Sequence, residues 1–376
     1  MKLNRRWWPL APLAAAAWVV AALAPATGAG AQQTSTPAAA AGLAASRACP
    51  PGGYALSFSD SLDKLVYHGV ELGGLSSLAW DARSRAWVSA VDNHGTDPAR
   101  IWFFRNLADP QVIRDPLVLK MPDGTPYDGN NSDNEGLAVL PDGDYLVSSE
   151  TEPSIRIYGR DGVQKASLPI PARFAVTGTT PAGQATSNAT LEGLTISRSG
   201  TEIVSSMEAA LSGDVSASGD ATRHRFLVYN EDRHGAWHLT KQIAYRTETG
   251  NRIPEVQAYG HDSLLVEEAA FTATAGNSEE LYAVRNTDSA PDVSSVTNLS
   301  DARARDVVKK QLVTNLVACP TLGAPARETQ TNPLLDNYEG MTVIGGPGLA
   351  EVSMISDDNF SATQFTRVLN LTARLP

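Results

Sequence analysis

The sequence lacks the short motifs that mark several common enzyme classes. Its 376 residues contain no Gly-x-Ser-x-Gly motif, so nothing supports the serine mechanism of α/β-hydrolases. Its six histidines form no His-Glu-x-x-His pattern, and we therefore do not expect a zinc site. No apolar run after residue 24 is long enough to cross a bilayer, so we expect no membrane-spanning helix there.

Positive charge is also scarce. The chain has 30 Lys and Arg residues against 41 Asp and Glu residues, which gives a formal net charge of -11. A surface this acidic repels nucleic acid and anionic lipid, and it suits a cation. We therefore expect a small-molecule substrate or a metal as the partner, no nucleic acid, no membrane span, and a monomer.

Cysteine occurs only twice, at Cys49 and Cys319. Each cysteine is followed by proline, and the two lie near opposite ends of the predicted folded region. In an exported protein this arrangement predicts one disulfide between Cys49 and Cys319, with two free thiols as the alternative.

The first 31 residues have the pattern of a secretory signal peptide. A basic start is followed by an alanine-rich apolar run over residues 10–24 and by the small-residue cleavage site Ala29-Gly30-Ala31. Residues 32–50 have no apolar period and predict a flexible linker. Residues 51–376 then form one domain of a secreted or periplasmic protein.

The segment from Asp133 to Glu150 predicts a β-hairpin. Two apolar runs flank the turn Pro141-Asp142-Gly143-Asp144. Folding the segment about the midpoint of this turn places Glu135 opposite Glu150. Both carboxylates then lie at one end of the hairpin.

The same pattern recurs along the chain, with acids at the same end of each predicted hairpin. Later copies begin at Glu192, Glu255 and Glu339, and a first copy begins at Gly73-Gly74-Leu75, where glycine replaces the opening glutamate. Each hairpin is followed by a third and usually a fourth apolar run, without helical segments between units. This repetition predicts an all-β fold, a single β-propeller of five four-stranded blades.

One strand from the N-terminal side is needed to close this propeller. The fifth unit lacks a fourth strand of its own, and either residues 54–59 or residues 62–67 supply it. Residues 287–308 and 324–335 read as inserted loops, the first with a short helix around residues 301–310. A sixth, degenerate blade has room in the same region.

The repeated acids predict two rings of carboxylates at one mouth of the central channel. Like charges held close together raise the pKa of one carboxyl unless a cation intervenes, so this arrangement favours a metal site. The candidate ligands are Asp92, Asp133, Glu135, Glu150, Glu192, Glu208, Glu267, Glu339, Asp357 and Asp358. Oxygen ligands in this number suit Ca²⁺ better than Mg²⁺ or Mn²⁺, which need fewer and stricter positions.

An alternative role for the repeated glutamates is structural. Each one could accept hydrogen bonds from backbone N–H groups of the neighbouring blade and so hold the blades together, and the residue pattern is compatible with both roles. If a metal is bound, Glu135, Glu192 and Glu339 are also candidates for general-base catalysis.

Three further residues are candidates for chemistry at the mouth. His94 follows Asp92 and is the histidine best placed for acid–base work, with a solvated loop position as the alternative. Arg100 and Arg225 begin third strands and are candidates for binding an anionic substrate. The alternative for both arginines is an ion pair with a carboxylate of the mouth.

These residues resemble a known family, the phytase-like β-propellers described by an esterase-like activity of phytase. The resemblance runs from about residue 70 to the C-terminus and rests on an ordered set of motifs: Gly73-Gly74-Leu75-Ser76-Ser77-Leu78, Val91-Asp92-Asn93, Asp133-Asn134-Glu135-Gly136, Val147-Ser148-Ser149-Glu150, Leu191-Glu192-Gly193-Leu194, Met207-Glu208, Asn337-Tyr338-Glu339-Gly340-Met341 and Ile355-Ser356-Asp357-Asp358-Asn359-Phe360. It implies a secreted or periplasmic propeller linked by name to the hydrolysis of phosphate esters or other esters. The fourth unit departs from the pattern, because Pro254-Glu255-Val256 replaces Glu-Gly-Leu.

Two classes of function follow. The first is a Ca²⁺-dependent phosphoric ester hydrolase that acts on phosphate esters or related esters at the acidic mouth. A related enzyme is a lactonase-type propeller hydrolase, in which Asn93, Asn134 and Asn359 join the site. The second class is a non-catalytic, calcium-stabilised ligand-binding or scaffold propeller of the cell envelope, favoured by the missing nucleophile motif and the few basic residues.

Overall fold

The computed structural model describes residues 47–92, 94–178 and 183–376. Within these ranges the regular elements are 24 β-strands and five 3-10 helices, η1 (Ala172–Phe174), η2 (Ser212–Asp214), η3 (Leu299–Asp301), η4 (Ala304–Asp306) and η5 (Leu316–Ala318). None of these helices has the length and hydropathy needed to span a bilayer. The predicted signal peptide and most of the predicted linker lie outside the described residues.

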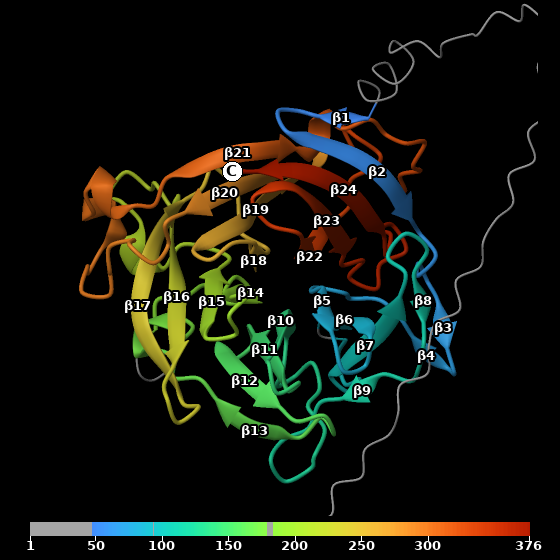
Figure 1. Ribbon diagram of the computed structural model, residues 1–376, viewed down its shortest axis with the longest axis horizontal. Coiled ribbons are helices and arrows are strands. Elements are labelled where there is room, and N and C mark those ends of the chain that lie inside the picture. Colours follow the sequence, from blue (N-terminus) through green and yellow to red (C-terminus); the bar gives the residue numbers. More distant parts are fainter. Residues whose placement is uncertain (1–46, 93, 179–182) are drawn as a thin grey trace, which may run out of the picture. The chain divides into compact units, whose positions relative to one another are not determined.

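The strands form five antiparallel blades around one centre, so the predicted all-β propeller is confirmed (Figure 1). Blade 1 contains β5 (Ala79–Asp81), β6 (Ala86–Ala90), β7 (Arg100–Arg105), β8 (Gln111–Val112) and β9 (Leu117–Val118). Blade 2 contains β10 (Asn134–Val139), β11 (Tyr145–Ser149), β12 (Ser154–Tyr158) and β13 (Gln164–Ser167). Blade 3 contains β14 (Leu191–Ile196), β15 (Glu202–Met207), β16 (Arg223–Glu231) and β17 (Trp237–Arg246). Blade 4 contains β18 (Val256–Ala258), β19 (Ser263–Thr272), β20 (Gly276–Arg285) and β21 (Lys310–Asn315).

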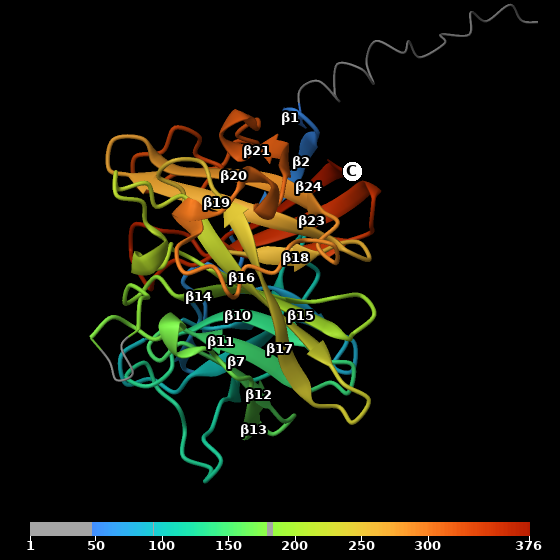
Figure 2. The same ribbon diagram turned by 90° about the vertical axis from the view of Figure 1, so that its left-hand side faces the viewer.

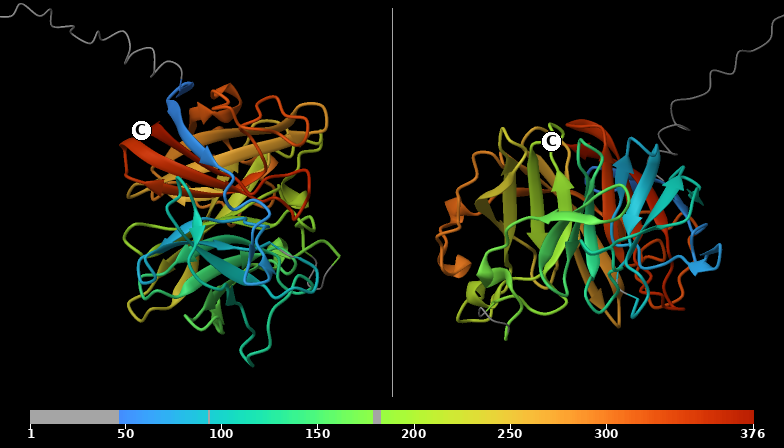
Figure 3. Two further views of the ribbon diagram at one scale, coloured as in Figure 1. Left: turned by 90° about the vertical axis from the view of Figure 1, so that its right-hand side faces the viewer. Right: turned by 90° about the horizontal axis from the view of Figure 1, so that it is seen from below.

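Blade 5 is built from both ends of the described chain. Its C-terminal strands are β22 (Tyr338–Ile344), β23 (Gly348–Ser356) and β24 (Val368–Leu375), and its N-terminal strands are β2 (Gly53–Ser59) and β1 (Ala48–Cys49). β2 pairs along β24 from Gly53↔Ala373 to Ser59↔Val368, and the two strands lie side by side in Figure 3. Of the two predicted closing segments, residues 54–59 therefore close the ring.

The second predicted closing segment takes no part in a blade. It contributes β3 (Val66–Tyr67), which pairs only with β4 (Val70–Glu71) in a two-stranded ribbon. Among the described residues no sixth blade is present, and the predicted helix near residues 301–310 consists of the short turns η3 and η4.

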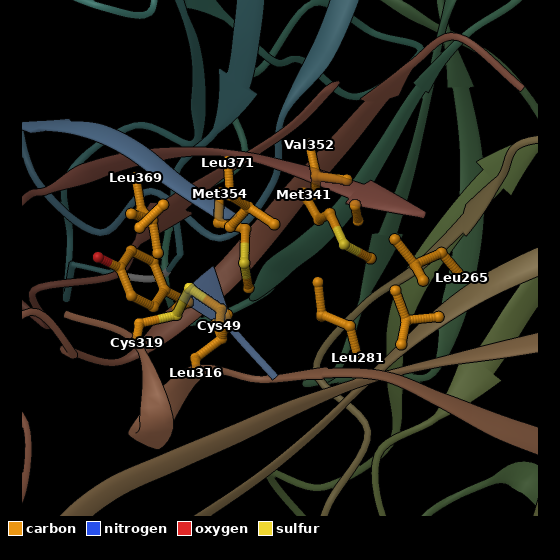
Figure 4. Close-up of a cluster of buried hydrophobic side chains, with 14 of the residues drawn as sticks. Cys49, Leu265, Leu281, Leu316, Cys319, Met341, Val352, Met354, Leu369 and Leu371 are labelled. Atoms are coloured by element: carbon orange, nitrogen blue, oxygen red, sulfur yellow. A yellow bond between two sulfur atoms is a disulfide. The ribbon is translucent and has the colours of Figure 1, made fainter. Parts of the chain in front are cut away.

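A disulfide joins the N-terminal strand to the fourth blade. Cys49 of β1 is bonded to Cys319, which directly follows η5. This confirms the predicted pair, and it also places the end of the predicted linker inside blade 5. Cys49 is fully buried, in the apolar cluster between blades 4 and 5 (Figure 4). Leu265 and Leu281 of blade 4 meet Met341 and Leu371 of blade 5 in this cluster.

A β-bulge interrupts the inner hairpin of blades 2, 3 and 5 at the Glu-Gly step. In blade 2, Glu135 and Gly136 lie opposite the single residue Ser148, and the N–H of Glu150 donates to the carbonyl oxygen of Asp133 (2.9 Å). The prediction that Glu135 lies opposite Glu150 is therefore wrong, because it assumed a regular ladder. A bulge inserts one extra residue and re-aims the side chains beside it.

The first blade also differs from its predicted alignment. Leu75 bridges to Val91, and the N–H of Asp92 donates to the carbonyl oxygen of Gly74 (2.8 Å). In blade 2 the equivalent contacts are the pair Asn134↔Ser149 and the hydrogen bond from the N–H of Glu150 to Asp133, so Leu75 matches Asn134 and Ser76 occupies the position of the glutamate. The prediction that a glycine replaces this glutamate is wrong.

Glycine after the glutamate allows neighbouring blades to approach closely. A Cβ atom on Gly136 would lie 2.4 Å from the Cβ of Leu194 and 2.5 Å from the carbonyl oxygen of Glu192. A Cβ atom on Gly340 would lie 2.5 Å from the carbonyl carbon of Ser77. Since these contacts are with the backbone of the next blade, a side chain there would push the two blades apart.

We expect Gly340→Ala to lower the free energy of unfolding by about 1–3 kcal/mol, the usual effect of overpacking a close contact. Gly346→Ala, in the turn of the same blade, is the control, because its Cβ would meet only the carbonyl oxygen of Tyr259 at 3.4 Å. Chemical denaturation of both variants measures the difference. Equal stability of the two variants would contradict the role given to Gly340.

Candidate metal centre

Six carboxylates gather in two groups at one end of the inner hairpins. The first acidic group is Asp92, Asp133 and Glu135, and the second acidic group is Glu150, Glu192 and Glu208. Within each group the ligand oxygens all lie within 4.8 Å of one another. Each group lies where two blades meet, because it combines the acid that closes one inner hairpin with acids of the next blade.

Burial and mutual repulsion raise the pKa values of these carboxyls. Burial, a hydrogen bond with Asp133 and the charge of Asp357 raise the pKa of Asp92 to about 11. Burial and the charge of Glu208 raise the pKa of Glu150 to about 8, against the effect of a hydrogen bond from the N–H of Thr190. A bound cation would favour the ionised forms, since it replaces repulsion by attraction.

The pKa values of Glu135 and Glu192 are also raised well above the ordinary value of a glutamate. Burial is the main cause of the raised pKa in both residues. The next cause is the charge of Glu192 for the pKa of Glu135, and the charge of Glu150 for the pKa of Glu192. The two acidic groups therefore influence each other and belong to one electrostatic unit.

The donor set fits a hard divalent cation. Both groups offer carboxylate oxygens alone, which is the chemistry that Ca²⁺ and related ions prefer. Glu192 is 5% exposed, and its Oε2 atom has no hydrogen-bond partner in the described part of the chain. A buried carboxylate oxygen without a donor is costly, and a metal ion would satisfy it.

Arg252 is the cation that the structure places among these acids, and the sequence analysis missed it. Its Nη1 atom lies 3.2 Å from Glu208, and its Nη2 atom lies 3.1 Å from Glu339 and 2.7 Å from the Oδ1 atom of Asn337. The only sequence signal was the irregular fourth unit, since Arg252 lies three residues before Glu255. Its positive charge offsets part of the repulsion at the second acidic group.

Several acids of the predicted rings, including Glu150 of the second acidic group, also accept hydrogen bonds from backbone N–H groups. Glu255 accepts from Leu194 of blade 3 (3.1 Å), and Glu150 accepts from Thr190 of the same blade. Asp358 accepts from the N–H of Gly74 (2.9 Å) and pairs with Lys64. The structural role considered for the glutamates therefore holds at these contacts, which link neighbouring blades.

Glu339 and Asp357 lie close enough to the two groups for their charges to raise the pKa values of group members, Asp92 among them, while Glu267 lies near Arg252. Asp357 is buried, and its pKa is raised by burial and then by the charge of Glu339. Glu267 is fully buried, and neither of its carboxylate oxygens has a hydrogen-bond partner among the residues described. The charges that act on Glu267 include those of Glu279 and Arg252.

His94 and Arg100 lie near Asp92 but are engaged with other side chains. The ring of His94 stacks on Phe360 with centroids 3.8 Å apart, and its Nδ1 atom lies 3.1 Å from Asp97. The Nη2 atom of Arg100 lies 3.2 Å from the same Asp97 carboxylate. Their predicted catalytic and substrate-binding roles stay predictions.

Arg225 is buried in blade 3, where it pairs with Asp214 and not with a member of the two acidic groups. It is 1% exposed, and its guanidinium forms two hydrogen bonds to Asp214, from Nε (2.6 Å) and Nη2 (2.8 Å). It also donates to Gln242 and to the carbonyl oxygens of Val293 and Val296. Since these contacts use the guanidinium fully, we leave Arg225 out of the proposed site.

A family model described as "Phytase-like: Esterase-like activity of phytase" matches residues 70–360. The chain belongs to this phytase-like family. The matched range begins just before blade 1 and includes every member of the two acidic groups. A comparison with curated protein sequences gave no match.

Several solved structures are similar to this phytase-like chain at low sequence identity. An α-L-arabinofuranosidase from Podospora anserina has 8% identity and a TM-score of 0.41, with 83% of this chain and 94% of that chain covered. An aldose sugar dehydrogenase from Streptomyces coelicolor has 9% identity and a TM-score of 0.36, with 87% and 100% covered. A virginiamycin B lyase from Staphylococcus aureus has 10% identity and a TM-score of 0.35, with 82% of each chain covered.

The raised pKa of Glu150 predicts the pH dependence of the metal-free protein. A carboxyl whose pKa is raised on folding stabilises the fold below its unfolded pKa, near 4.5, and this stabilisation is lost as pH rises through about 8. We expect the melting temperature in chelator to fall by a few degrees between pH 5 and pH 8. Differential scanning calorimetry measures this change.

Glu150→Gln serves as the control for this pH dependence. The amide keeps an oxygen that can accept from Thr190 but does not titrate, so the fall in melting temperature should be smaller in this variant. A melting temperature that rises between pH 5 and pH 8 in the metal-free wild type would contradict the assignment.

Proposed function

We propose that this phytase-like chain is an exported, Ca²⁺-dependent hydrolase of phosphate esters or related esters. The observation that carries the proposal is the pair of three-carboxylate groups where the blades meet, with an oxygen of Glu192 that has no hydrogen-bond partner among the described residues. The family description adds esterase-like activity of phytase. We further propose that residues 1–31 are a signal peptide, that the linker predicted over residues 32–50 ends before β1 (Ala48–Cys49), and that one monomeric domain, secreted or periplasmic, follows it.

The residues of the chain divide the work as follows. Glu135 and Glu192, together with the other acids of each group, would hold the cation. When bound, a divalent cation attracts an anionic ester, polarises its oxygen and acidifies a water molecule. Arg252 orients Glu208 and Glu339 through its two Nη atoms, and we assign Glu339 as the carboxylate that accepts the proton of the attacking water.

A second candidate is a calcium-stabilised scaffold or ligand-binding propeller of the cell envelope. The contacts that favour it are the backbone hydrogen bonds accepted by Glu150 and Glu255, which join blades without any chemistry. In this case the cation strengthens the contact between blades and no ester is hydrolysed. The lactonase-type alternative has less support, because Asn134 was expected to join its site. The side chain of Asn134 instead accepts a hydrogen bond from Ser132 and donates one to the carbonyl oxygen of Val91.

Calcium titration by calorimetry on metal-stripped protein tests the site. We expect Glu135→Gln and Glu192→Gln each to weaken Ca²⁺ binding by about tenfold or more, since each removes one charged ligand of a hard cation. Glu202→Gln is the matched control, because Glu202 lies at the opposite end of the inner hairpin of blade 3. This control should bind Ca²⁺ like the wild type.

Hydrolysis of 4-nitrophenyl phosphate, phytate and a lactone in saturating Ca²⁺ separates the candidate functions. Phosphate-ester turnover that requires Ca²⁺ and falls with Glu192→Gln supports the hydrolase. A melting temperature that rises with Ca²⁺ without any turnover supports the scaffold. Absence of Ca²⁺ binding would overturn both, and the acids would then act as hydrogen-bond acceptors alone.

A further inference from the structure

The long insertion between β20 and β21 is fixed to the outside of blade 3. It lies beyond β17, as the orange segment at the edge of the ring (Figures 1 and 3). Buried Arg225 and Asp214 hold it: Arg225 donates to the carbonyl oxygens of Val293 and Val296, and Asp214 accepts from the N–H of Leu299 (2.9 Å). The insertion then pairs with β17 at Val307, opposite Ala244.

This anchored insertion forms one wall of a pocket of about 490 Å³. Four basic side chains line the pocket. Arg223 lies in β16 and Arg246 in β17, and these two strands face the viewer in Figure 2. Lys309 ends the insertion, and Lys310 begins β21. Glu248 is the only acid among its lining residues in the described part of the chain. In a chain of net charge -11, this pocket concentrates the opposite charge.

In the described part of the chain, three of the four basic residues have no carboxylate within ion-pair distance. Lys310 pairs with Glu248 and Glu268, which accounts for its charge. Across residues 47–376, with their two gaps, no carboxylate lies within ion-pair distance of Arg223, Arg246 or Lys309.

The hydrogen bonds that Arg223 and Arg246 donate go to neutral atoms. The Nε atom of Arg246 donates to Thr222 Oγ1 (3.3 Å), Arg223 donates to the carbonyl oxygen of Leu299, and the Nε atom of Arg223 is buried without a described partner. Asp220 lies close enough for its pKa to be lowered by the charges of Arg246 and Arg223, after stronger hydrogen bonds from Thr222. Positive charge therefore remains available in the pocket.

We propose that this pocket binds the phosphate group of a small organic molecule. Guanidinium and ammonium groups that converge on one pocket are the usual partners of phosphate oxygens. The pocket volume lies in the range of small-molecule sites. The proposal does not depend on hydrolysis at the acidic groups, because every residue that carries it lies outside them.

A neighbouring pocket gives the organic part of such a molecule a place to lie. This second pocket, of about 550 Å³, shares Thr247 and Thr249 with the basic pocket and extends to Glu208 and Arg252. Small side chains, Ala209, Ala210 and Ala221 among them, line it. A ligand held by its phosphate group can therefore extend toward the second acidic group, and this extension rests on the proposed function.

Calorimetric titration with inorganic phosphate tests the basic pocket. The protein is stripped of metal and dialysed free of chelator at low salt, so that phosphate cannot bind through a cation. We expect one phosphate per chain, weakened by added NaCl and weakened about tenfold or more in the double variant Arg246→Glu, Lys309→Glu. Both side chains are exposed, and the neutral double variant Arg246→Gln, Lys309→Gln provides a milder version of the same change.

Two controls separate this pocket from other sources of binding. Arg105→Glu reverses an exposed charge on blade 1, and Glu192→Gln changes the acidic site; neither should alter phosphate binding. Failure of the wild type to bind phosphate would overturn the proposal. Binding by the Arg246→Glu, Lys309→Glu variant that equals wild-type binding would overturn it as well. A third experiment sediments the protein with vesicles of phosphatidylcholine and phosphatidic acid. If the protein sediments with these vesicles and inorganic phosphate prevents it, the choice of a small molecule is overturned and the pocket is assigned to lipid headgroups.

Discussion

Burial of like charges at the centre of the ring is the constraint on which the structure depends. The inner hairpins bring carboxylates of neighbouring blades within 4.8 Å, where repulsion and loss of water both oppose ionisation. The chain offsets this cost with Arg252 and with backbone N–H donors from adjacent blades. What remains uncompensated, such as Oε2 of Glu192, defines where a cation has most to contribute.

The outer parts of the blades supply the rigidity that holds these charges together. Apolar clusters fill the spaces between neighbouring sheets, and the cluster between blades 4 and 5 also contains the disulfide. Glycines at the Glu-Gly steps let the first strands approach, and the bulges turn the adjacent glutamates. The packing between blades and the acidic groups therefore depend on the same dipeptides.

Repetition made the blades and the acidic end of each hairpin predictable, because a strand of alternating or apolar residues ending in a turn is a local signal. The detailed register was not predictable, since the bulge at Glu135 and Gly136 depends on contact with Leu194 of the next blade. Arg252 was missed for a similar reason: it lies in a loop without a motif and reaches the acids only through tertiary folding. Arg225 has the charge needed to bind an anion. Its ion pair with Asp214 was not predictable, because Asp214 lies in the segment between β15 and β16 and no motif indicates that the two residues meet.

The pairing of β2 with β24 has a consequence for how the protein is made. Blades 1 to 4 each consist of strands that are consecutive in the chain, with the insertion between β20 and β21 as the longest interruption in blade 4, so each can form soon after its own segment is synthesised. Blade 5 must wait, because β2 and its partner β24 lie at opposite ends of the described chain. Contacts between such distant segments form slowly, so ring closure is expected to be the final step of folding. Until then the edge of β2 is exposed to other chains, and a chaperone that covers it would protect the nascent protein.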